Sequence, residues 1–219
     1  MRKKTKLLLL GMYVIAIIII LSVVLFMSSP VYPPKIQATP VPTVAPPEVY
    51  LPSGLEAITT LPANTLNVTY INQGNGNYCG PACLTMVLNY WGYNVSLQNM
   101  IKAVFNTTGN NMTMISTIVT YGTNFPNLTF SSFTGNILML QNYIDSGIPV
   151  IVTQNMTVQN PIWHFRVVVG YNNQGFVVDD PYYGQCLITY SNFDVFWHQN
   201  NTIINSTLAI YPHRTIIDA

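Results

Sequence analysis

Three residues that lie far apart in the sequence have the side chains of a nucleophile, a base and an orienting acid. The nucleophile is Cys79, which directly precedes Gly80-Pro81 at the start of a segment whose apolar spacing predicts a helix over 78–91. A helix N-terminus carries about half a positive charge and free N–H groups, so it stabilises a thiolate and lowers the pKa of a cysteine. Thiolate is the nucleophilic form, whereas a buried structural cysteine is the commoner alternative.

His164 and Asp180 are the partners that such a thiol needs. His164 begins a valine-rich segment predicted to be a strand, and Asp180, sixteen residues later, ends the next predicted strand. If these strands pair antiparallel, the two side chains lie side by side, where a carboxylate fixes the tautomer of an imidazole and supports its protonated form. The alternatives are a histidine packed beside Trp163 and Phe165, and an aspartate that starts a turn before Pro181.

A fourth candidate, Gln73, stands six residues before Cys79. The loop between them, residues 74–78, is rich in Gly and Asn and can fold back. The Gln73 amide would then lie beside the backbone N–H of Cys79 and donate a hydrogen bond to an oxyanion. Taken alone, a glutamine in such a loop is more often an ordinary loop residue.

The segments that must position these residues predict an α+β fold, with helices first and antiparallel strands second. Apolar spacing and caps predict helices over 78–91, 96–105, 112–121, 136–146 and 191–197. Short apolar runs bounded by turn residues predict strands over 149–153, 164–171, 175–179, 186–190 and 207–211. The predicted sheet would thus carry His164 and Asp180, and the first helix would carry Cys79.

The order and spacing of these motifs resemble the papain-like cysteine peptidases that process bacteriocin leaders. The resemblance covers about residues 65–212 and rests on Gln73, Cys79-Gly80-Pro81-Ala82-Cys83-Leu84, His164-Phe165-Arg166, Asp179-Asp180-Pro181 and Ser191-Asn192-Phe193. It implies a papain-like fold in which a central helix packs on an antiparallel sheet. It also implies site roles: nucleophile Cys79, base His164, orienting group Asp180 and oxyanion donor Gln73.

The activity that this resemblance implies is hydrolysis of a peptide or protein substrate without a cofactor. Two other functions stay open: an acyl transferase or transpeptidase, because an amine can replace water, and a binding module without turnover. The best-studied relatives are domains of export ATPases, but this sequence has no G-x-x-x-x-G-K-[ST] motif, so we expect no use of ATP. The residue before the nucleophile, often Asp in the family, is Tyr78 here.

The remaining cysteines predict a disulfide. In an oxidising compartment, three cysteines suggest one bridge and one working thiol. We expect Cys83 to pair with Cys186 and Cys79 to stay free, with three reduced cysteines as the alternative. A zinc site is disfavoured, because the spacings do not fit and the chain has only 3 His.

Charged residues are few and unevenly placed. They make up 7% of the 219 residues, and four of the 8 basic ones lie within residues 1–6. From residue 28 onward there are 4 basic and 7 acidic residues, a net charge of 4 − 7 = −3. So little positive charge cannot neutralise a row of phosphates, which excludes a nucleic-acid partner.

The front of the chain predicts a membrane anchor. Residues 7–27 are uncharged, and as a helix they would span about 32 Å, close to the hydrocarbon thickness of a bilayer. We expect an uncleaved signal anchor with the basic tip, residues 1–6, in the cytoplasm and the peptidase domain, residues 63–219, outside the cell. The alternative is a cleaved signal peptide and a secreted domain. Residues 28–62 hold nine of the 15 prolines and predict an extended stalk or, less in keeping with that location, a ligand for a proline-binding module.

An extracellular domain of this composition also predicts a glycoprotein. Eight Asn residues stand in Asn-x-Ser/Thr, which can also arise by chance in a chain rich in Asn and Thr. They are Asn67, Asn94, Asn106, Asn111, Asn127, Asn155, Asn200 and Asn205.

Overall fold

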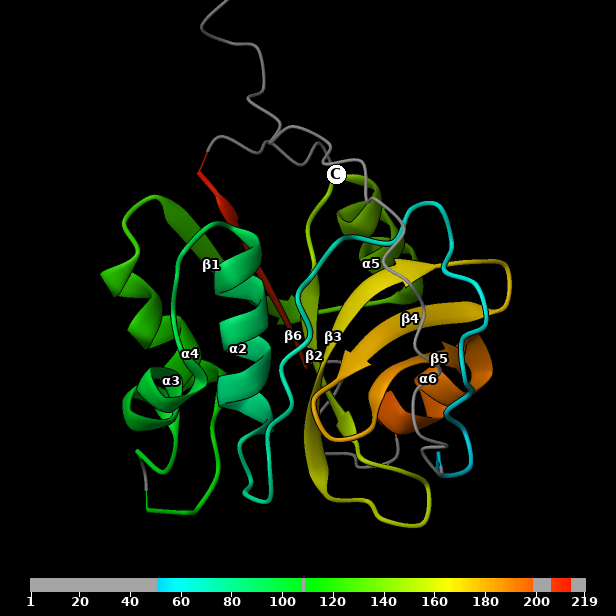
Figure 1. Cartoon of the computed structure of the whole chain (residues 1–219), viewed down its shortest axis with the longest axis horizontal. Coiled ribbons are helices and arrows are strands. Elements are labelled where there is room, and N and C mark those ends of the chain that lie inside the picture. The colour runs from blue at the N-terminus through cyan, green and yellow to red at the C-terminus, as the bar shows by residue number, and fades with distance from the viewer. Residues whose placement is uncertain (1–50, 108, 199–205, 214–219) are drawn as a thin grey trace, which may run out of the picture. The chain divides into compact units, whose positions relative to one another are not determined.

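The computed structural model describes residues 51–107, 109–198 and 206–213, in which an antiparallel sheet separates two groups of helices (Figure 1). Across the sheet the strand order is β1-β6-β2-β3-β4-β5. The strands are β1 Leu128–Thr134, β2 Val150–Asn155, β3 Trp163–Tyr171, β4 Gly175–Asp180, β5 Gly184–Thr189 and β6 Ser206–Pro212. The helices are α2 Cys79–Tyr90, α3 Leu97–Val104, α4 Ile115–Tyr121, the short 3-10 helix η1 Gly122–Asn124, α5 Ile137–Asp145 and α6 Tyr190–His198.

Each face of the sheet has its own hydrophobic core, because side chains alternate between the faces along every strand. Val167 of β3 and Val177 of β4 pack with α2, α3 and α4 on one face. Val168 and Val178 point the other way and pack with α5 and α6. Both faces of the central strands are therefore dry, which explains why these strands are runs of valine without polar alternation.

Helix α2, which carries Cys79, is deeply buried. Residues 80–88 are all buried, so this helix lies inside the protein and is not a surface helix with one apolar stripe. Pro81 fits its first turn, where a missing N–H costs no helical hydrogen bond. Gly92 follows its end with φ of 86°, a left-handed conformation that favours glycine. The predicted helix over 78–91 is thus confirmed.

A segment without regular structure, residues 55–73, runs from β5 to β3 and then to the turn after β4, and we call it the strap. It begins where Glu56 forms an isolated antiparallel bridge with Leu187 of β5. Leu55, Glu56 and Ile58, which the sequence analysis placed in the stalk, therefore contact the folded domain. The strap ends at Gln73, one of the predicted site residues.

The other predicted helices and strands are present, with ends that differ by a few residues, and the α+β fold with an antiparallel sheet is confirmed. One strand was missed: β1, Leu128–Thr134, which precedes α5, so helices and strands are not fully segregated. It is an edge strand that pairs only with β6, and most of its residues are partly exposed. A Ser/Thr-rich edge strand lacks the apolar run that identifies the buried strands.

Part of the membrane prediction falls outside the described residues. The predicted anchor, residues 7–27, and the stalk up to residue 50 belong to that part. Among the residues that are described, none of the helices has the length and apolar character needed to cross a bilayer.

The predicted Cys83–Cys186 disulfide is wrong, because all three cysteines are free thiols. Cys83 lies on α2 and packs in the core between α2 and the sheet, whereas Cys186 lies on β5 and packs in the core on the opposite face. The sheet separates the two side chains, so they cannot meet the geometry of a disulfide. Both are fully buried and act as small core residues.

The predicted glycosylation of Asn155 is wrong as well. Asn155 is the last residue of β2, pairs with Trp163 of β3 and is only 4% exposed, so its side chain has no room for a glycan. Five other predicted sites are exposed: Asn67, Asn94, Asn106, Asn111 and Asn127. Asn200 and Asn205 lie outside the described residues.

Candidate active site

The start of α2 holds Cys79 in a partly exposed position, among backbone N–H groups that no helical carbonyl accepts. Close packing fixes this turn. A Cβ on Gly80 would lie 2.7 Å from the Cβ of Thr113, so glycine is needed where the turn approaches the loop before α4. The sequence thus delivers a thiol to a helix N-terminus, as predicted.

The first residues of β3 pair with β2 only, so the backbone groups on their other side remain available to the Cys79 thiol. β3 pairs with β2 from Trp163 onward, but its pairing with β4 begins only at Val167, opposite Asp179. The backbone of Phe165 is therefore free of β4 and forms a hydrogen bond that stabilises the Cys79 thiolate. The active-site candidate lies where the N-terminus of α2 meets this edge.

His164 and Asp180 form the predicted pair, with 2.9 Å between His164 Nε2 and Asp180 Oδ1. The side chains are 3% and 0% exposed. Backbone N–H groups of Tyr182 and Tyr183 donate to the same Asp180 oxygen at 2.8 and 3.0 Å. Because Nε2 donates to the carboxylate, Nδ1 is the ring nitrogen that remains for Cys79.

Arg166, to which the sequence analysis assigned no role, holds the other oxygen of Asp180. Its Nε donates to Asp180 Oδ2 at 2.8 Å. Its terminal nitrogens donate to Gln154 Oε1 at 3.2 Å and to the backbone carbonyls of Asn155 and Met156. The guanidinium is fully buried yet well supplied with acceptors. An arginine within a valine-rich strand is the sequence signal for such a buried ion pair.

The charges of these groups favour a thiolate facing an imidazolium. Burial of Cys79 opposes ionisation, but the hydrogen bond and positive charge of His164 outweigh it and lower the pKa of the thiol. Burial would lower the pKa of His164, but the charge and hydrogen bond of Asp180, together with Cys79, raise it to about 9. Burial also opposes ionisation of Asp180, yet the charges of His164 and Arg166 hold its pKa well below the ordinary value.

Gln73 reaches the same region through the strap. Its backbone N–H donates to the carbonyl of Pro181 at 2.8 Å, which ties the strap to the turn after Asp180. Its Nε2 donates to the carbonyl of Gly76 at 2.7 Å, within the loop that leads to Cys79. The side chain is 8% exposed, and its amide has a second N–H that remains for another acceptor.

Exposed apolar side chains stand beside these polar groups. Ile162 and Trp163, which directly precede His164, are 53% and 42% exposed, and Tyr182, two residues after Asp180, is 52% exposed. We call Ile162, Trp163 and Tyr182 the apolar rim. Exposed apolar side chains of this size next to polar groups are a feature of binding surfaces.

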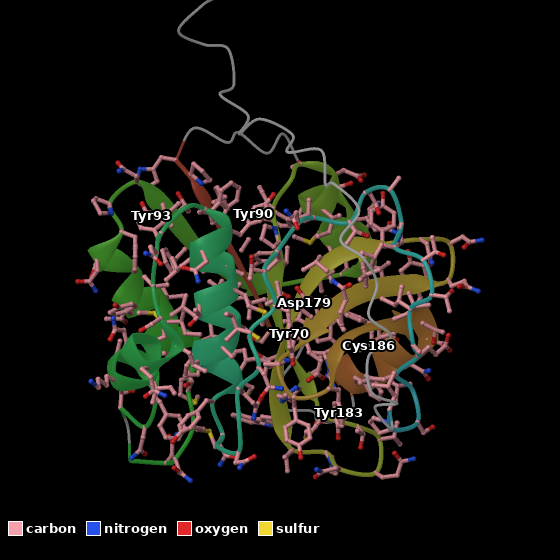
Figure 2. The ribbon with its side chains drawn as sticks, in the orientation of Figure 1. Tyr70, Tyr90, Tyr93, Asp179, Tyr183 and Cys186 are labelled. Atoms are coloured by element: carbon pink, nitrogen blue, oxygen red, sulfur yellow. The ribbon has the colours of Figure 1, made fainter. Side chains whose placement is uncertain are left out.

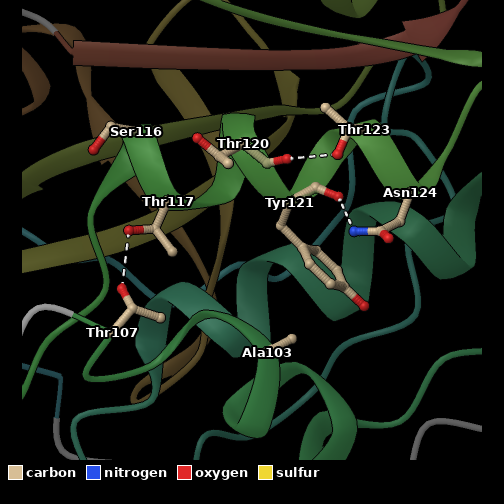
Figure 3. Close-up of a pocket in the computed structure, with 8 residues that line it drawn as sticks. All are labelled: Ala103, Thr107, Ser116, Thr117, Thr120, Tyr121, Thr123 and Asn124. Carbon is tan, nitrogen blue, oxygen red and sulfur yellow. Dashed lines mark hydrogen bonds between the residues drawn. The ribbon is translucent and has the colours of Figure 1, made fainter.

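A separate hollow of about 510 Å³ lies between α3 and α4 (Figure 3). Its polar lining consists mainly of hydroxyl groups, some of them bonded to one another, as in the 3.1 Å contact between Thr107 and Thr117. Its lining includes no cysteine, histidine or charged residue, and therefore no group that could act as a nucleophile paired with a base. The cluster around Cys79 remains the candidate active site.

Comparison with known families matches residues 65–203 to the Peptidase_C39 like family. The matched segment contains all four predicted site residues and most of the residues of both cores. None of the curated proteins compared with the chain matches it.

Solved structures with the same fold include three peptidases of low sequence identity. A double glycine motif protease from an AMS/PCAT transporter, in complex with its leader peptide, is 21% identical, with TM-score 0.52 over 68% of this chain and 94% of that one. The peptidase domain of Streptococcus ComA, a bifunctional ABC transporter of a quorum-sensing pathway, is 23% identical, with TM-score 0.52 over 66% and 97%. A putative C39-like peptidase from Bacillus anthracis is 18% identical, with TM-score 0.54 over 67% and 96%.

At these identities the solved structures establish the fold, and the family assignment rests on the family match. That match spans well over half of the 219 residues and includes the helix and the strands that hold Cys79, His164 and Asp180. The chain therefore belongs to the Peptidase_C39 like family and is a cysteine peptidase.

Proposed function

We propose that Cys79, His164 and Asp180 are the catalytic triad with which this peptidase hydrolyses peptide bonds. One observation carries the proposal: the Cys79 thiol, with its lowered pKa, interacts with His164, which in turn is bonded to Asp180 at 2.9 Å. A thiolate paired with an imidazolium supplies both the nucleophile and the acid that peptide cleavage requires.

The reaction follows from this arrangement. The Cys79 thiolate attacks the carbonyl carbon of the scissile bond and forms a tetrahedral oxyanion. His164 then gives its proton to the leaving amine, the C–N bond breaks, and an acyl-enzyme with a thioester at Cys79 remains. Water gives a proton to His164 and attacks the thioester, and the acid product leaves as the thiolate is restored.

Gln73 serves this reaction as an oxyanion donor in our proposal. The side chain is fixed through Gly76 and the main chain through Pro181, which keeps the amide beside the loop that leads to Cys79. Its second amide N–H and the backbone N–H of Cys79 would donate to the oxyanion. Donors that are fixed before the reaction stabilise this charge without a cost of reorganisation.

We propose a peptide, or an exposed segment of a protein, as the substrate. The apolar rim supports this choice, since its side chains flank His164 and Asp180 and carry no charge. The leader peptide bound to the AMS/PCAT protease belongs to that protein, and it supports a peptide ligand of this fold.

We further propose that residues 7–27 anchor the enzyme in a membrane and that the peptidase domain lies outside the cell. The length of the uncharged segment and the basic residues before it support this topology. Protease added to intact cells should then remove the domain and spare the first residues. A domain that is protected until the cells are lysed would contradict the topology and leave the peptidase function untouched.

The function itself is tested with a peptide library. The full chain in detergent is incubated with the library, and new peptide termini are identified by mass spectrometry. We expect cleavage by the wild type, none by Cys79→Ala, and cleavage by Cys186→Ala, which removes a buried thiol on the other face of the sheet. Equal cleavage by the wild type and Cys79→Ala would refute the proposal.

A further inference from the structure

The loop that leads to Cys79, residues 74–78, contains the single Asn-Gly pair of the chain, Asn75-Gly76. Asparagine deamidates most readily before glycine, because glycine has no side chain to shield its backbone nitrogen from the asparagine side chain. Asn75 is exposed, and within the described residues neither its side chain nor the Gly76 N–H forms a hydrogen bond. The groups that react in a deamidation are therefore open to water and held by no other contact of that kind.

A nearby asparagine of the strap is held by its contacts instead. Asn72 Nδ2 donates to the hydroxyl of Tyr70 at 3.2 Å, and Asn72 Oδ1 accepts from the backbone N–H of Gly74 at 2.7 Å. Figure 2 shows Tyr70 on the strap, between α2 and the sheet in this view. Asn72 is also followed by Gln73, whose side chain hinders attack by its backbone nitrogen. Asn75 differs from Asn72 in both respects.

Packing requires glycine at position 76. A Cβ there would lie 2.1 Å from the ring of Tyr78, and that ring also packs edge-on against Phe105, with 4.8 Å between the ring centroids. A side chain at position 76 would therefore force the Tyr78 ring to move, directly before Cys79. The fold thus needs the glycine that makes Asn75 labile.

The same glycine holds the proposed oxyanion donor. Gln73 Nε2 donates to the Gly76 carbonyl at 2.7 Å. The other polar atom of this side chain, Oε1, is buried without a hydrogen-bond partner among the described residues. Within that part of the chain, the bond to Gly76 is thus the one that fixes the Gln73 amide. The Gly76 carbonyl has to keep its place if the second amide N–H is to face the oxyanion.

Deamidation changes the main chain at this point. The Gly76 nitrogen loses its proton to a base in solution and attacks the side-chain carbonyl carbon of Asn75, and the amide nitrogen takes up a proton and leaves as ammonia. Water then opens the cyclic imide at either carbonyl, which gives aspartate or, as the main product, isoaspartate. In isoaspartate the main chain runs through the former side chain, so a methylene group is added before Gly76.

We infer that Asn75 converts spontaneously to isoaspartate and that this change inactivates the peptidase, because the lengthened loop withdraws the Gly76 carbonyl from Gln73. The inference rests on the proposed role of Gln73 in the reaction. It limits the working life of each enzyme molecule without an inhibitor or a second protease. Because the contact to the oxyanion exists only in the transition state, conversion should lower kcat about 100-fold and leave KM nearly constant.

The test ages the full chain in detergent at pH 8 and follows residue 75 by peptide mapping. Activity is measured with a peptide that the fresh wild type cleaves. We expect the fraction of isoaspartate at position 75 and the fraction of lost activity to rise together. Protein isoaspartyl methyltransferase with its methyl donor returns isoaspartate to aspartate, so treatment of the aged enzyme should restore the activity.

Three variants sharpen this test. Asn75→Gln lacks the labile pair and should keep its activity through the same ageing. Asn75→Asp carries the charge of the product on an ordinary main chain, so it should be active when fresh. Asn77→Gln is the matched control, because it replaces an exposed asparagine of the same loop that is followed by Tyr78, and it should lose activity as the wild type does.

The outcomes separate the inference from the function on which it rests. If the fresh wild type is active, the inference is refuted by full activity in protein with isoaspartate at position 75, or by no isoaspartate there after ageing. It is refuted equally if Asn75→Gln loses activity as fast as the wild type, or if repair of the isoaspartate restores none. In these cases the proposed function stands. If the fresh wild type cleaves no peptide of the library, the proposed function fails, and the inference with it.

Discussion

At the scale of single residues, Asp180 receives hydrogen bonds from both His164 and Arg166, one at each oxygen. The arginine neutralises the buried carboxylate and fixes its orientation, and the carboxylate fixes the imidazole. The position of His164 therefore depends on Arg166, which does not touch the thiol in this arrangement.

Replacing Arg166 tests how much its ion pair with Asp180 stabilises the fold. In Arg166→Met, Asp180 loses a buried partner, so we expect the free energy of unfolding in urea to fall by about 3–5 kcal/mol. Lys102→Met removes an exposed cation from α3 and is the control, expected to stay within about 0.5 kcal/mol. Similar losses of unfolding free energy in the two variants would show that the buried Arg166–Asp180 pair stabilises the fold no more than an exposed cation does.

Asp179 makes a separate prediction about stability. Its pKa is about 6 when folded against an ordinary 3.8, so the folded state binds the proton more tightly, and stability falls as pH rises from 3.8 through about 6. Asp179→Asn lacks this loss and should gain about 2.4 kcal/mol over the wild type between pH 4 and pH 8. His164 is unchanged in both proteins and cancels. Urea unfolding at both pH values measures the gain, and a difference that does not change with pH would contradict the buried ionisation.

Residue types and spacing were enough to predict that Cys79, His164 and Asp180 come together, because each stands beside a helix start or strand end that the sequence marks. Gln73 lies at the turn after Asp180, and its role as an oxyanion donor stays a prediction. They were not enough for the cysteine pairing. Cys83 and Cys186 occupy opposite faces, and which face a strand residue occupies depends on the register of β4 and β5. The pairing of Arg166 with Asp180 likewise depends on the register of β3 and β4, which local sequence does not specify.

At the scale of elements, the site forms where the pairing of β3 with β4 stops. β3 extends beyond its pairing with β4, and the N-terminus of α2 meets the part that is left. Trp163, the first residue of this extension, is exposed to solvent. The helices and buried strands were predictable from apolar spacing, whereas this offset between β3 and β4 was not, because it arises from long-range pairing with a bulge near Val169.

The apolar rim should contribute to substrate binding more than to chemistry. For Trp163→Ala we expect KM for a cleaved peptide to rise about tenfold with kcat changed less than about threefold, because the side chain binds substrate and transition state alike. Leu138→Ala removes a leucine of α5 that is 65% exposed, on the other side of the sheet, and should change neither value. A fall in kcat with KM unchanged would assign Trp163 to the chemistry instead.

At the scale of the whole molecule, the described body has a surface of low charge. Its fully buried charges are Arg166, Asp179 and Asp180, so few charged residues remain to keep the surface hydrated. Exposed Asn-x-Ser/Thr sites would supply polar glycans to such a surface if the domain lies outside the cell.

Exposure predicts which of those sites carry glycans. In a host that glycosylates exported proteins, we expect modification among Asn67, Asn94, Asn106, Asn111 and Asn127. The buried Asn155 should stay unmodified. Peptide mapping before and after enzymatic deglycosylation measures occupancy at each site. A glycan on Asn155 would contradict the placement of β2, and none on any exposed site would contradict the extracellular topology.

The central claim, that Cys79 is a nucleophile activated by His164, is tested most directly with an irreversible peptidyl acyloxymethyl ketone. Intact-protein mass spectrometry and peptide mapping follow the adduct at pH 5.5 in the wild type, His164→Ala and Cys186→Ala. We predict a single adduct on Cys79, unchanged in Cys186→Ala and formed at least about 100-fold more slowly in His164→Ala. Equal rates in the wild type and His164→Ala, or an adduct on Cys83 instead, would contradict the account.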